Sequence, residues 1–206
     1  MRVPSTLLLA TSLCLAACGG DDDDTAGDGG GNENEVITTV TLDFAAQGGG
    51  DAVSVEWNDP DGDGGAGPTI DPINLADGTT YTLAVGFENR LEDPPEIISQ
   101  EVMDESDQHQ IFFTGTAVSG PASDAEGAPM TQSYGDQDVN GFPVGLENTV
   151  VAAAGTGQLT VTLRHMPPVN DTPVKTGTLG QVVIDSGVEG LPGSTDAQVN
   201  FDVTVE

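Results

Sequence analysis

The most specific chemistry in this sequence lies in residues 136–147, which match the calcium-loop pattern D-x-[DN]-x-[DN]-G-x5-E at every specified position. Asp136, Asp138 and Asn140 offer side-chain oxygens at alternate positions. Phe142 offers its carbonyl oxygen, and Glu147 can close the site with two carboxylate oxygens. Because hard oxygen ligands in this order suit Ca²⁺, the sequence predicts a structural calcium site in this loop.

The segments on either side of this loop are typical of strands rather than of the two helices of an EF-hand. Met130, Gln132 and Tyr134 alternate with polar residues before the loop, and residues 148–153 form a second strand-like run after it. We therefore expect a static staple between strands and not a calcium sensor. The alternative is a hairpin loop whose Asp and Asn side chains hydrogen-bond to their own backbone.

A second acidic loop follows residue 58 and gives a weaker match. Asp59, Asp61 and Asp63 fit the first half of the calcium pattern, but Ile70 stands where the closing Glu belongs. Asp71, one residue further on, can substitute only if the loop is remodelled. An Asp- and Gly-rich turn facing solvent is the favoured interpretation.

Other candidates for catalysis or metal binding are few. His109 and His165 are the only imidazoles, and a zinc site or a catalytic base can be built from such a pair. Both stand beside apolar residues in predicted strands, which favours histidines of the core or the sheet edge. Neither a G-x-S-x-G elbow nor an H-E-x-x-H motif occurs. The sequence therefore predicts that the protein is not an enzyme, and that Arg164 pairs with a carboxylate across a sheet.

Apolar residues alternate with polar ones in many short runs, as in half-buried strands. These runs lie in residues 36–44, 53–57, 81–87, 111–118, 130–134, 148–153, 159–165 and 197–205. Residues 96–107 are the one helical candidate, residues 155–157 read as a turn, and residues 167–194 read as a Pro- and Gly-rich excursion. The pattern predicts an all-β fold, an immunoglobulin-like or Greek-key β-sandwich of about eight strands with at most one short helix.

The N-terminus reads as a targeting segment. Residues 1–17 form a signal peptide whose apolar part is too short to span a bilayer. The run that ends in Cys18 resembles the lipobox of bacterial lipoproteins, which implies cleavage before Cys18 and acylation of that residue. Residues 18–35 are an acidic flexible linker, and residues 36–206 form the β-sandwich domain. That domain has no cysteine, so bound metal could supply part of its stability.

The charge of the chain limits its partners. It has 34 acidic residues, four Lys and Arg residues, and a formal net charge of −30. Such a surface repels nucleic acid and anionic lipid, and favours divalent cations. Gly19 after the lipidated cysteine implies, by resemblance, transport to the outer membrane. The Asp run at residues 21–24 resembles the tether of surface-displayed lipoproteins.

Several blocks resemble a group of uncharacterised bacterial outer-membrane lipoproteins. The matching stretches are residues 35–42, 59–64, 109–113, 136–147 and 155–165. Some members of that group are labelled as type 1 periplasmic binding folds, but a domain of this size with one helix cannot build two α/β lobes. The resemblance implies domain limits and no activity.

We therefore expect a non-enzymatic, lipid-anchored protein of the cell outer membrane, which could be exposed at the surface. It would act as an interaction or structural module with an envelope protein or glycan as partner. The alternative is an accessory module that binds carbohydrate or another small ligand. That function calls for exposed aromatic side chains, and aromatics make up only 4% of the chain.

Overall fold

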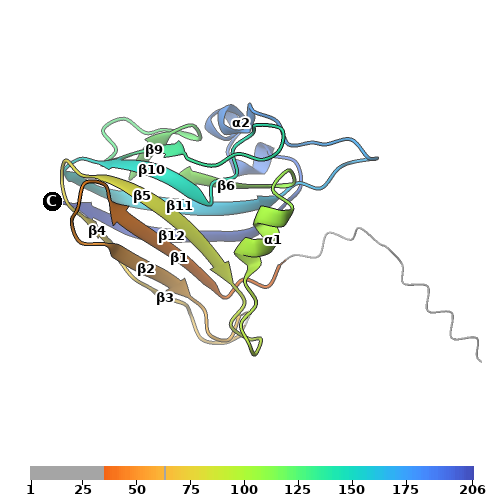
Figure 1. The fold of residues 1–206 in the computed structure, drawn as a ribbon, viewed down its shortest axis with the longest axis horizontal. Coiled ribbons are helices and arrows are strands. Elements are labelled where there is room, and N and C mark those ends of the chain that lie inside the picture. Colours follow the sequence, from red (N-terminus) through yellow and green to blue (C-terminus); the bar gives the residue numbers. More distant parts are fainter. Residues whose placement is uncertain (1–34, 63) are drawn as a thin grey trace, which may run out of the picture. The chain divides into compact units, whose positions relative to one another are not determined.

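The computed structural model describes residues 35–62 and 64–206, whose strands form two sheets that pack against each other (Figure 1). The predicted signal peptide, Cys18, most of the predicted linker and Asp63 lie outside the described residues. Within the described part of the chain, none of the helices has the length and apolar character needed to cross a bilayer.

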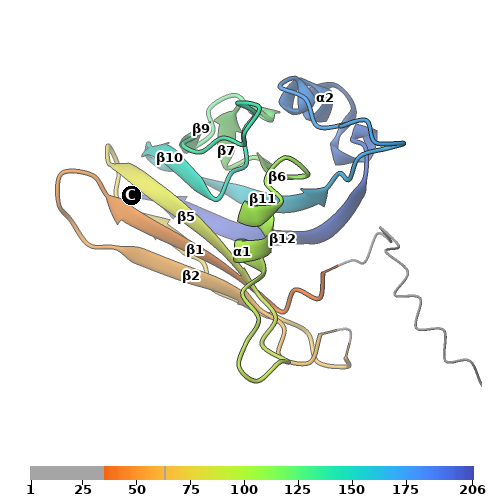
Figure 2. The same cartoon turned by 45° about the vertical axis from the view of Figure 1, so that its right-hand side comes forward.

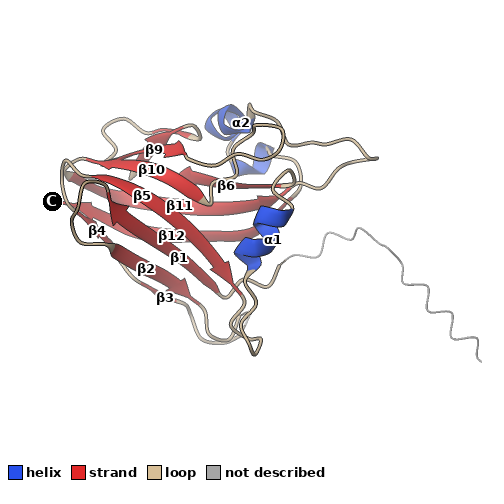
Figure 3. Cartoon of the chain, in the orientation of Figure 1, coloured by secondary structure: helices blue, strands red, loops and turns tan. Residues whose placement is uncertain are grey.

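Sheet A has eight strands, in the spatial order β3 (Thr69–Ile70), β2 (Val53–Asn58), β1 (Thr39–Ala46), β5 (Thr80–Glu88), β10 (Glu147–Ala152), β9 (Met130–Tyr134), β7 (Val118–Gly120) and β8 (Ser123–Asp124). Sheet B has four, in the order β4 (Ile73–Leu75), β12 (Ser194–Val205), β11 (Gly155–His165) and β6 (His109–Thr114). Neighbouring strands are antiparallel except in the pairs β7–β9 and β4–β12. The chain changes sheet before β4, β5, β6, β7 and β11, so distant segments become neighbours (Figure 3).

One core fills the space between the two sheets, and its residues are the apolar members of the alternating runs. In β1, Val40, Leu42 and Phe44 are buried while Asp43 faces solvent. Phe44 lies opposite Val53 in the antiparallel pair of β1 and β2. Burying a large apolar side chain is worth about 1.5–3 kcal/mol, and this cluster draws such side chains from both sheets. The predicted all-β sandwich is confirmed.

A second helix is the main difference from the prediction. α1 (Ile98–Asp104) falls in the predicted helical segment and buries Ile98 and Val102 beside β5 (Figure 2). α2 (Leu179–Ser186) was not predicted, and a short 3-10 helix, η1 (Val188–Gly190), follows it. β-branched residues and Gly180 give α2 a weak helix propensity. It forms because Leu179 and Val183 pack on the outer face of sheet B.

The strand count is also higher than predicted, because short pairs such as β7 and β8 are too brief to show a periodic pattern. The predicted turn at residues 155–157 was wrong. Gly155 and Gly157 begin β11, where they pair with β12. A Cβ at position 157 would lie 2.8 Å from the Ala117 backbone, so this glycine reflects a close approach of two segments and not a turn.

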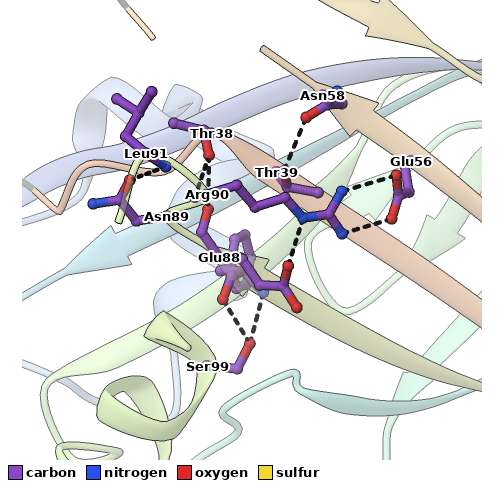
Figure 4. Close-up of polar contacts among 10 residues, drawn as sticks. Thr38, Thr39, Glu56, Asn58, Glu88, Asn89, Arg90, Leu91 and Ser99 are labelled. Atoms are coloured by element: carbon purple, nitrogen blue, oxygen red, sulfur yellow. Dashed lines mark hydrogen bonds and ion pairs between the residues drawn. The ribbon is translucent and has the colours of Figure 1, made fainter. Parts of the chain in front are cut away.

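The three cations after Cys18 each hold a junction of the fold. Arg90 donates to both carboxylate oxygens of Glu56 at 2.8 and 3.2 Å and to Glu88 at 2.7 Å, which links β2 to β5 (Figure 4). Arg164 donates to the Thr195 hydroxyl and to the carbonyl oxygens of residues 191–193. The predicted partner of Arg164, a carboxylate across the sheet, is therefore replaced by a hydroxyl and backbone carbonyls. Lys175 is described with the candidate sites below.

Candidate metal centre

The acidic loop, as we call residues 136–147, joins β9 to β10 in sheet A and reaches across to the edge of sheet B. The backbone N–H of Ile111 in β6 donates to the carbonyl oxygen of Val144 at 2.7 Å. Tyr134 Oη donates to the carbonyl oxygen of Ile111 at 2.8 Å. At Gly145, φ is +101°, and a Cβ would lie 2.9 Å from Ile111 Cβ. The loop therefore covers the edge of β6 and ties the two sheets together.

The Asp136 carboxylate forms its hydrogen bonds with backbone groups of this loop. Its carboxylate accepts hydrogen bonds from the backbone N–H groups of Gly145, Leu146 and Glu147 at 2.7, 2.8 and 3.1 Å. These bonds fix the turn that returns the chain into β10. They are the self-capping contacts that the sequence left open as the alternative to calcium binding.

Asp138 combines backbone capping with a buried ion pair. Its Oδ1 accepts from the N–H groups of Asn140 and Phe142 at 2.8 and 2.9 Å. Its Oδ2 lies 3.0 Å from Lys175 Nζ, and both side chains are almost fully buried, with 0% and 1% exposed. Lys175 Nζ also donates to the carbonyl oxygen of Ser106 at 2.7 Å. An ammonium group of the chain itself thus provides the positive charge in this loop.

The pKa values of this pair reflect the same contacts. Burial acts to raise the pKa of Asp138, but hydrogen bonds from Phe142, Lys175 and Asn140 outweigh it and hold that pKa below its ordinary value. Burial lowers the pKa of Lys175, and the bond to Asp138 offsets part of that shift. Removing either residue would leave the other charge buried without a partner, which strongly destabilises the folded state.

The predicted calcium ligands do not converge on one point. The side chains of Asn140 and Glu147 are exposed, and the carbonyl oxygen of Phe142 accepts the N–H of Asp138 at 2.8 Å. In the described residues, one group of three His, Cys, Asp or Glu residues has ligand atoms all within 4.8 Å of one another, and it contains neither Asp136, Asp138 nor Glu147. Calcium binding stays a prediction, and a bound ion would share the carboxylate oxygens of Asp136 and Asp138 with the backbone N–H groups whose hydrogen bonds they already accept.

The weaker candidate loop is not assembled as a calcium site either. Asp61 Oδ2 accepts from the N–H of Ala66 at 3.2 Å, and Asp71 Oδ2 accepts from the N–H of Glu56 at 3.2 Å. Asp59 lies at the end of β2. Asp63 is outside the described residues. Asp61 and Asp71 serve different turns, as expected of Asp in solvent-facing loops.

The group whose ligand atoms do converge consists of Glu105, His109 and His165, and we call it the histidine cluster. Each residue places one ligand atom so that all three lie within 4.8 Å of one another. His109 opens β6 and His165 ends β11, and the two face each other directly in the antiparallel register. Their rings stack with centroids 4.5 Å apart and planes 8° from parallel.

Glu105 joins the cluster because α1 ends beside β6. The backbone N–H of Glu105 donates to the carbonyl oxygen of Glu101 at 2.8 Å, which closes the last turn of α1. The Glu105 carbonyl oxygen lies 3.1 Å from His109 Nδ1 and accepts a hydrogen bond from that ring nitrogen when it is protonated. In that tautomer His109 Nε2 carries the lone pair, and the ring is held in a fixed orientation.

Burial is the main influence on the pKa of His109. Burial lowers the pKa of His109, and the nearby His165 lowers it further, while the Glu105 carbonyl acts in the opposite direction. His109 is only 1% exposed, whereas Glu105 and His165 are partly accessible. In the described chain, His165 Nδ1 is buried and has no hydrogen-bond partner. A buried ring nitrogen without a partner is uncommon in folded proteins.

Carboxylates surround the cluster. Burial raises the pKa of Asp196 to about 6, although His165 and Arg164 act to lower it. Burial raises the pKa of Glu35 to about 7, and Glu101 contributes through its charge and a hydrogen bond. Burial is thus the main cause of both shifts, and like charge contributes only at Glu35.

The sequence raised a zinc site at the two histidines as one possibility, but it did not single out Glu105. It favoured satisfied core or edge positions for both histidines, and His109 is indeed buried at the edge strand of sheet B. The sequence does contain one indication of the pair. His109 begins one strand and His165 ends another, so an antiparallel pairing of these strands can bring the two rings together. Only the register of β6 against β11 brings the two rings together.

The carbohydrate-binding alternative calls for exposed aromatic side chains. Among the described residues, none of the large exposed hydrophobic side chains is aromatic. Trp57 and Tyr134 pack partly buried against the core. A hollow of about 420 Å³ lies beside α2, but Asp124 is the only ionisable side chain that lines it.

Comparisons with known proteins identify no relatives of this chain. It matches no protein-family model, no curated protein and no solved structure. The resemblance to outer-membrane lipoproteins therefore stays an expectation from the sequence.

Proposed function

We propose that this chain is a lipid-anchored protein of the cell envelope whose β-sandwich acts as a binding or structural module and not as an enzyme. The observation that carries the proposal is the run of small and apolar residues that ends in Cys18. Two or more acyl chains on one residue give stable anchoring, where a single chain gives only marginal binding.

The structure of the domain is consistent with this function. The acidic loop and the three cations join strands and sheets, so the acidic and basic groups they contain serve to hold the fold. The domain has no cysteine, and such contacts substitute for disulfide bonds outside the cytoplasm. The strongly acidic chain favours a neutral or basic partner over nucleic acid or anionic lipid.

The anchor is tested by replacing Cys18 with Ala and following incorporation of a labelled fatty acid in cells. We expect the wild-type protein to carry the label and to sediment with membranes, and Cys18→Ala to lose both properties. Cys14 is the only other cysteine, so Cys14→Ala is the matched control and should retain the label. A labelled Cys18→Ala variant, or an unlabelled wild type, would refute the anchor.

The destination is tested separately at Gly19. Because Asp at this position is associated with retention at the inner membrane in the lipoproteins that the N-terminus resembles, Gly19→Asp should move the protein from the outer-membrane fraction to the inner-membrane fraction. Separation of the two membranes on a density gradient measures this shift. Wild-type protein found in the inner-membrane fraction would contradict the outer-membrane assignment.

A further inference from the structure

The histidine cluster has features that a histidine pair used only for packing does not need. Three potential ligands from three different places, the end of α1, the start of β6 and the end of β11, converge to within 4.8 Å. A pair of stacked core histidines would satisfy its ring nitrogens with carbonyl or hydroxyl partners. Here His165 Nδ1 is buried without any such partner in the described chain.

The surroundings hold these ligands in place. His109 Nδ1 is oriented by the Glu105 carbonyl oxygen, a contact typical of histidines that bind metals through their other nitrogen. Gln108 N–H donates to the Glu105 carbonyl, and Met166 N–H donates to the Gln108 carbonyl, which tie the α1–β6 turn to the end of β11. Lys175 holds the same turn through the Ser106 carbonyl oxygen. The cluster is therefore built on fixed elements.

We propose that Glu105, His109 and His165 form a binding site for a divalent transition-metal ion, with Zn²⁺ as the ion that fits best. Two imidazoles and one carboxylate are a zinc ligand set that leaves a fourth position for water or another ligand. Because imidazole lone pairs lie in the plane of the ring, the partly accessible His165 ring must turn out of its stack on His109 to bind the same ion. Imidazole also suits Cu²⁺ and Ni²⁺, whereas Ca²⁺ and Mg²⁺ prefer sites made only of oxygen. Acidic groups also interact electrostatically with both imidazoles, Glu101 with His109 and Asp196 with His165.

This site goes beyond the proposed anchor and uses none of the predicted calcium ligands. A metal ion bound there would also stabilise a domain that has no cysteine and therefore no disulfide bond. An ion held by α1, β6 and β11 would join the helix to sheet B, as the acidic loop joins sheet A to sheet B. Zinc that binds only the folded form stabilises it by mass action.

The proposal is tested by titrating Zn²⁺ into the purified full-length protein, prepared without a polyhistidine tag, by calorimetry. Co²⁺ is titrated in parallel, because its visible absorption reports the ligands directly. We expect one tight site per chain, with His165→Gln and Glu105→Gln each weakening binding by about tenfold or more. Both residues are partly accessible, so these variants should fold. Glu92→Gln, an exposed acid after β5, is the matched control and should bind as the wild type does.

His109→Gln completes the set, with its fold checked by circular dichroism because the residue is buried. Weaker zinc binding in both accessible variants, with an altered Co²⁺ spectrum, supports the three-ligand site. Absent zinc binding would overturn it. Binding that either His165→Gln or Glu105→Gln leaves unchanged would also overturn it, because the ion would then be held elsewhere.

Discussion

The acidic loop and the histidine cluster lie on the two sides of Lys175, and they use their polar groups in opposite ways. In the loop, two of the three carboxylates of the calcium pattern are matched by groups of the chain itself, backbone N–H groups for Asp136 and an ammonium group for Asp138. In the cluster, three potential ligand atoms lie close together, and a buried ring nitrogen has no partner in the described chain. The order of ligand types along the chain therefore does not by itself show which ligand atoms come together in the fold.

The largest effect is expected at the buried ion pair. Asp138→Ala leaves the Lys175 ammonium buried without its carboxylate, and removing one partner of such a pair costs about 3–5 kcal/mol. Urea denaturation of the variant measures this loss as a lower unfolding midpoint.

Glu147→Ala is the control, since its side chain is exposed and should change stability by about 0.5 kcal/mol or less. A second variant, Asp138→Leu combined with Lys175→Met, removes both charges and should recover part of the loss. Equal losses for Asp138→Ala and Glu147→Ala would show that the ion pair does not hold the loop.

The next largest effect is the change in stability when Zn²⁺ or Ca²⁺ is added, and it should differ between the histidine cluster and the acidic loop. Zinc at about a hundredfold above its dissociation constant should stabilise the wild type by about 2.7 kcal/mol. Thermal unfolding should show a higher melting temperature with Zn²⁺, and no such increase in His165→Gln. Millimolar Ca²⁺ should raise the melting temperature less than Zn²⁺ does, because the acidic loop is already held by hydrogen bonds of its own. A calcium-dependent increase that exceeds the zinc-dependent one, and that Asp136→Ala abolishes, would reverse this order.

A somewhat smaller effect is expected at Asp136. Asp136→Ala leaves three backbone N–H groups of the loop without their acceptor and should cost about 2 kcal/mol. Asp136→Asn keeps one acceptor oxygen and should lose less. Hydrogen exchange of the Gly145, Leu146 and Glu147 amides measures the local effect. Unchanged protection of these amides in Asp136→Ala would contradict the self-capping role.

The smallest effect concerns the acids near the cluster. Glu35 ionises near 4.5 when its surroundings are removed, and burial with Glu101 raises its pKa to about 7 in the fold. The folded state thus binds this proton more tightly, so the contribution of Glu35 to stability is present below pH 4.5 and is lost as the pH rises to about 7. Because the group is only partly buried and solvent screens its interactions, the change should be about 0.5 kcal/mol or less.

Denaturation curves at pH 4.5 and pH 7.5 measure this dependence. Glu35→Gln should flatten the difference in stability between the two pH values, and Glu92→Gln should leave it as in the wild type. An unchanged difference in Glu35→Gln would assign the effect to other groups.

The sequence predicted most of the fold because the core strands alternate strictly. Val40, Leu42 and Phe44 in β1, and Val199, Phe201 and Val203 in β12, are buried as the period of two requires. It could not predict α2, whose residues have weak helix propensity and become helical through contacts with sheet B. Propensity yields to packing where a short segment covers an apolar face.

The sites were less predictable than the fold. The calcium pattern describes ligand order along the chain, but whether Asp136 and Asp138 face an ion or their own backbone depends on the turn between them and on Lys175, a residue far away in sequence. Glu105, His109 and His165 share no motif, because their meeting depends on the register of β6 with β11 and on where α1 ends. Such information lies in the pairing of strands and not in local spacing.

The most direct test of this comparison is the position of the ion itself, found by anomalous diffraction from crystals of the protein grown with Zn²⁺. We predict an anomalous peak bounded by Glu105, His109 and His165, and none beside Asp136 and Asp138. A peak within the acidic loop, or no peak at the histidine cluster, would contradict the account.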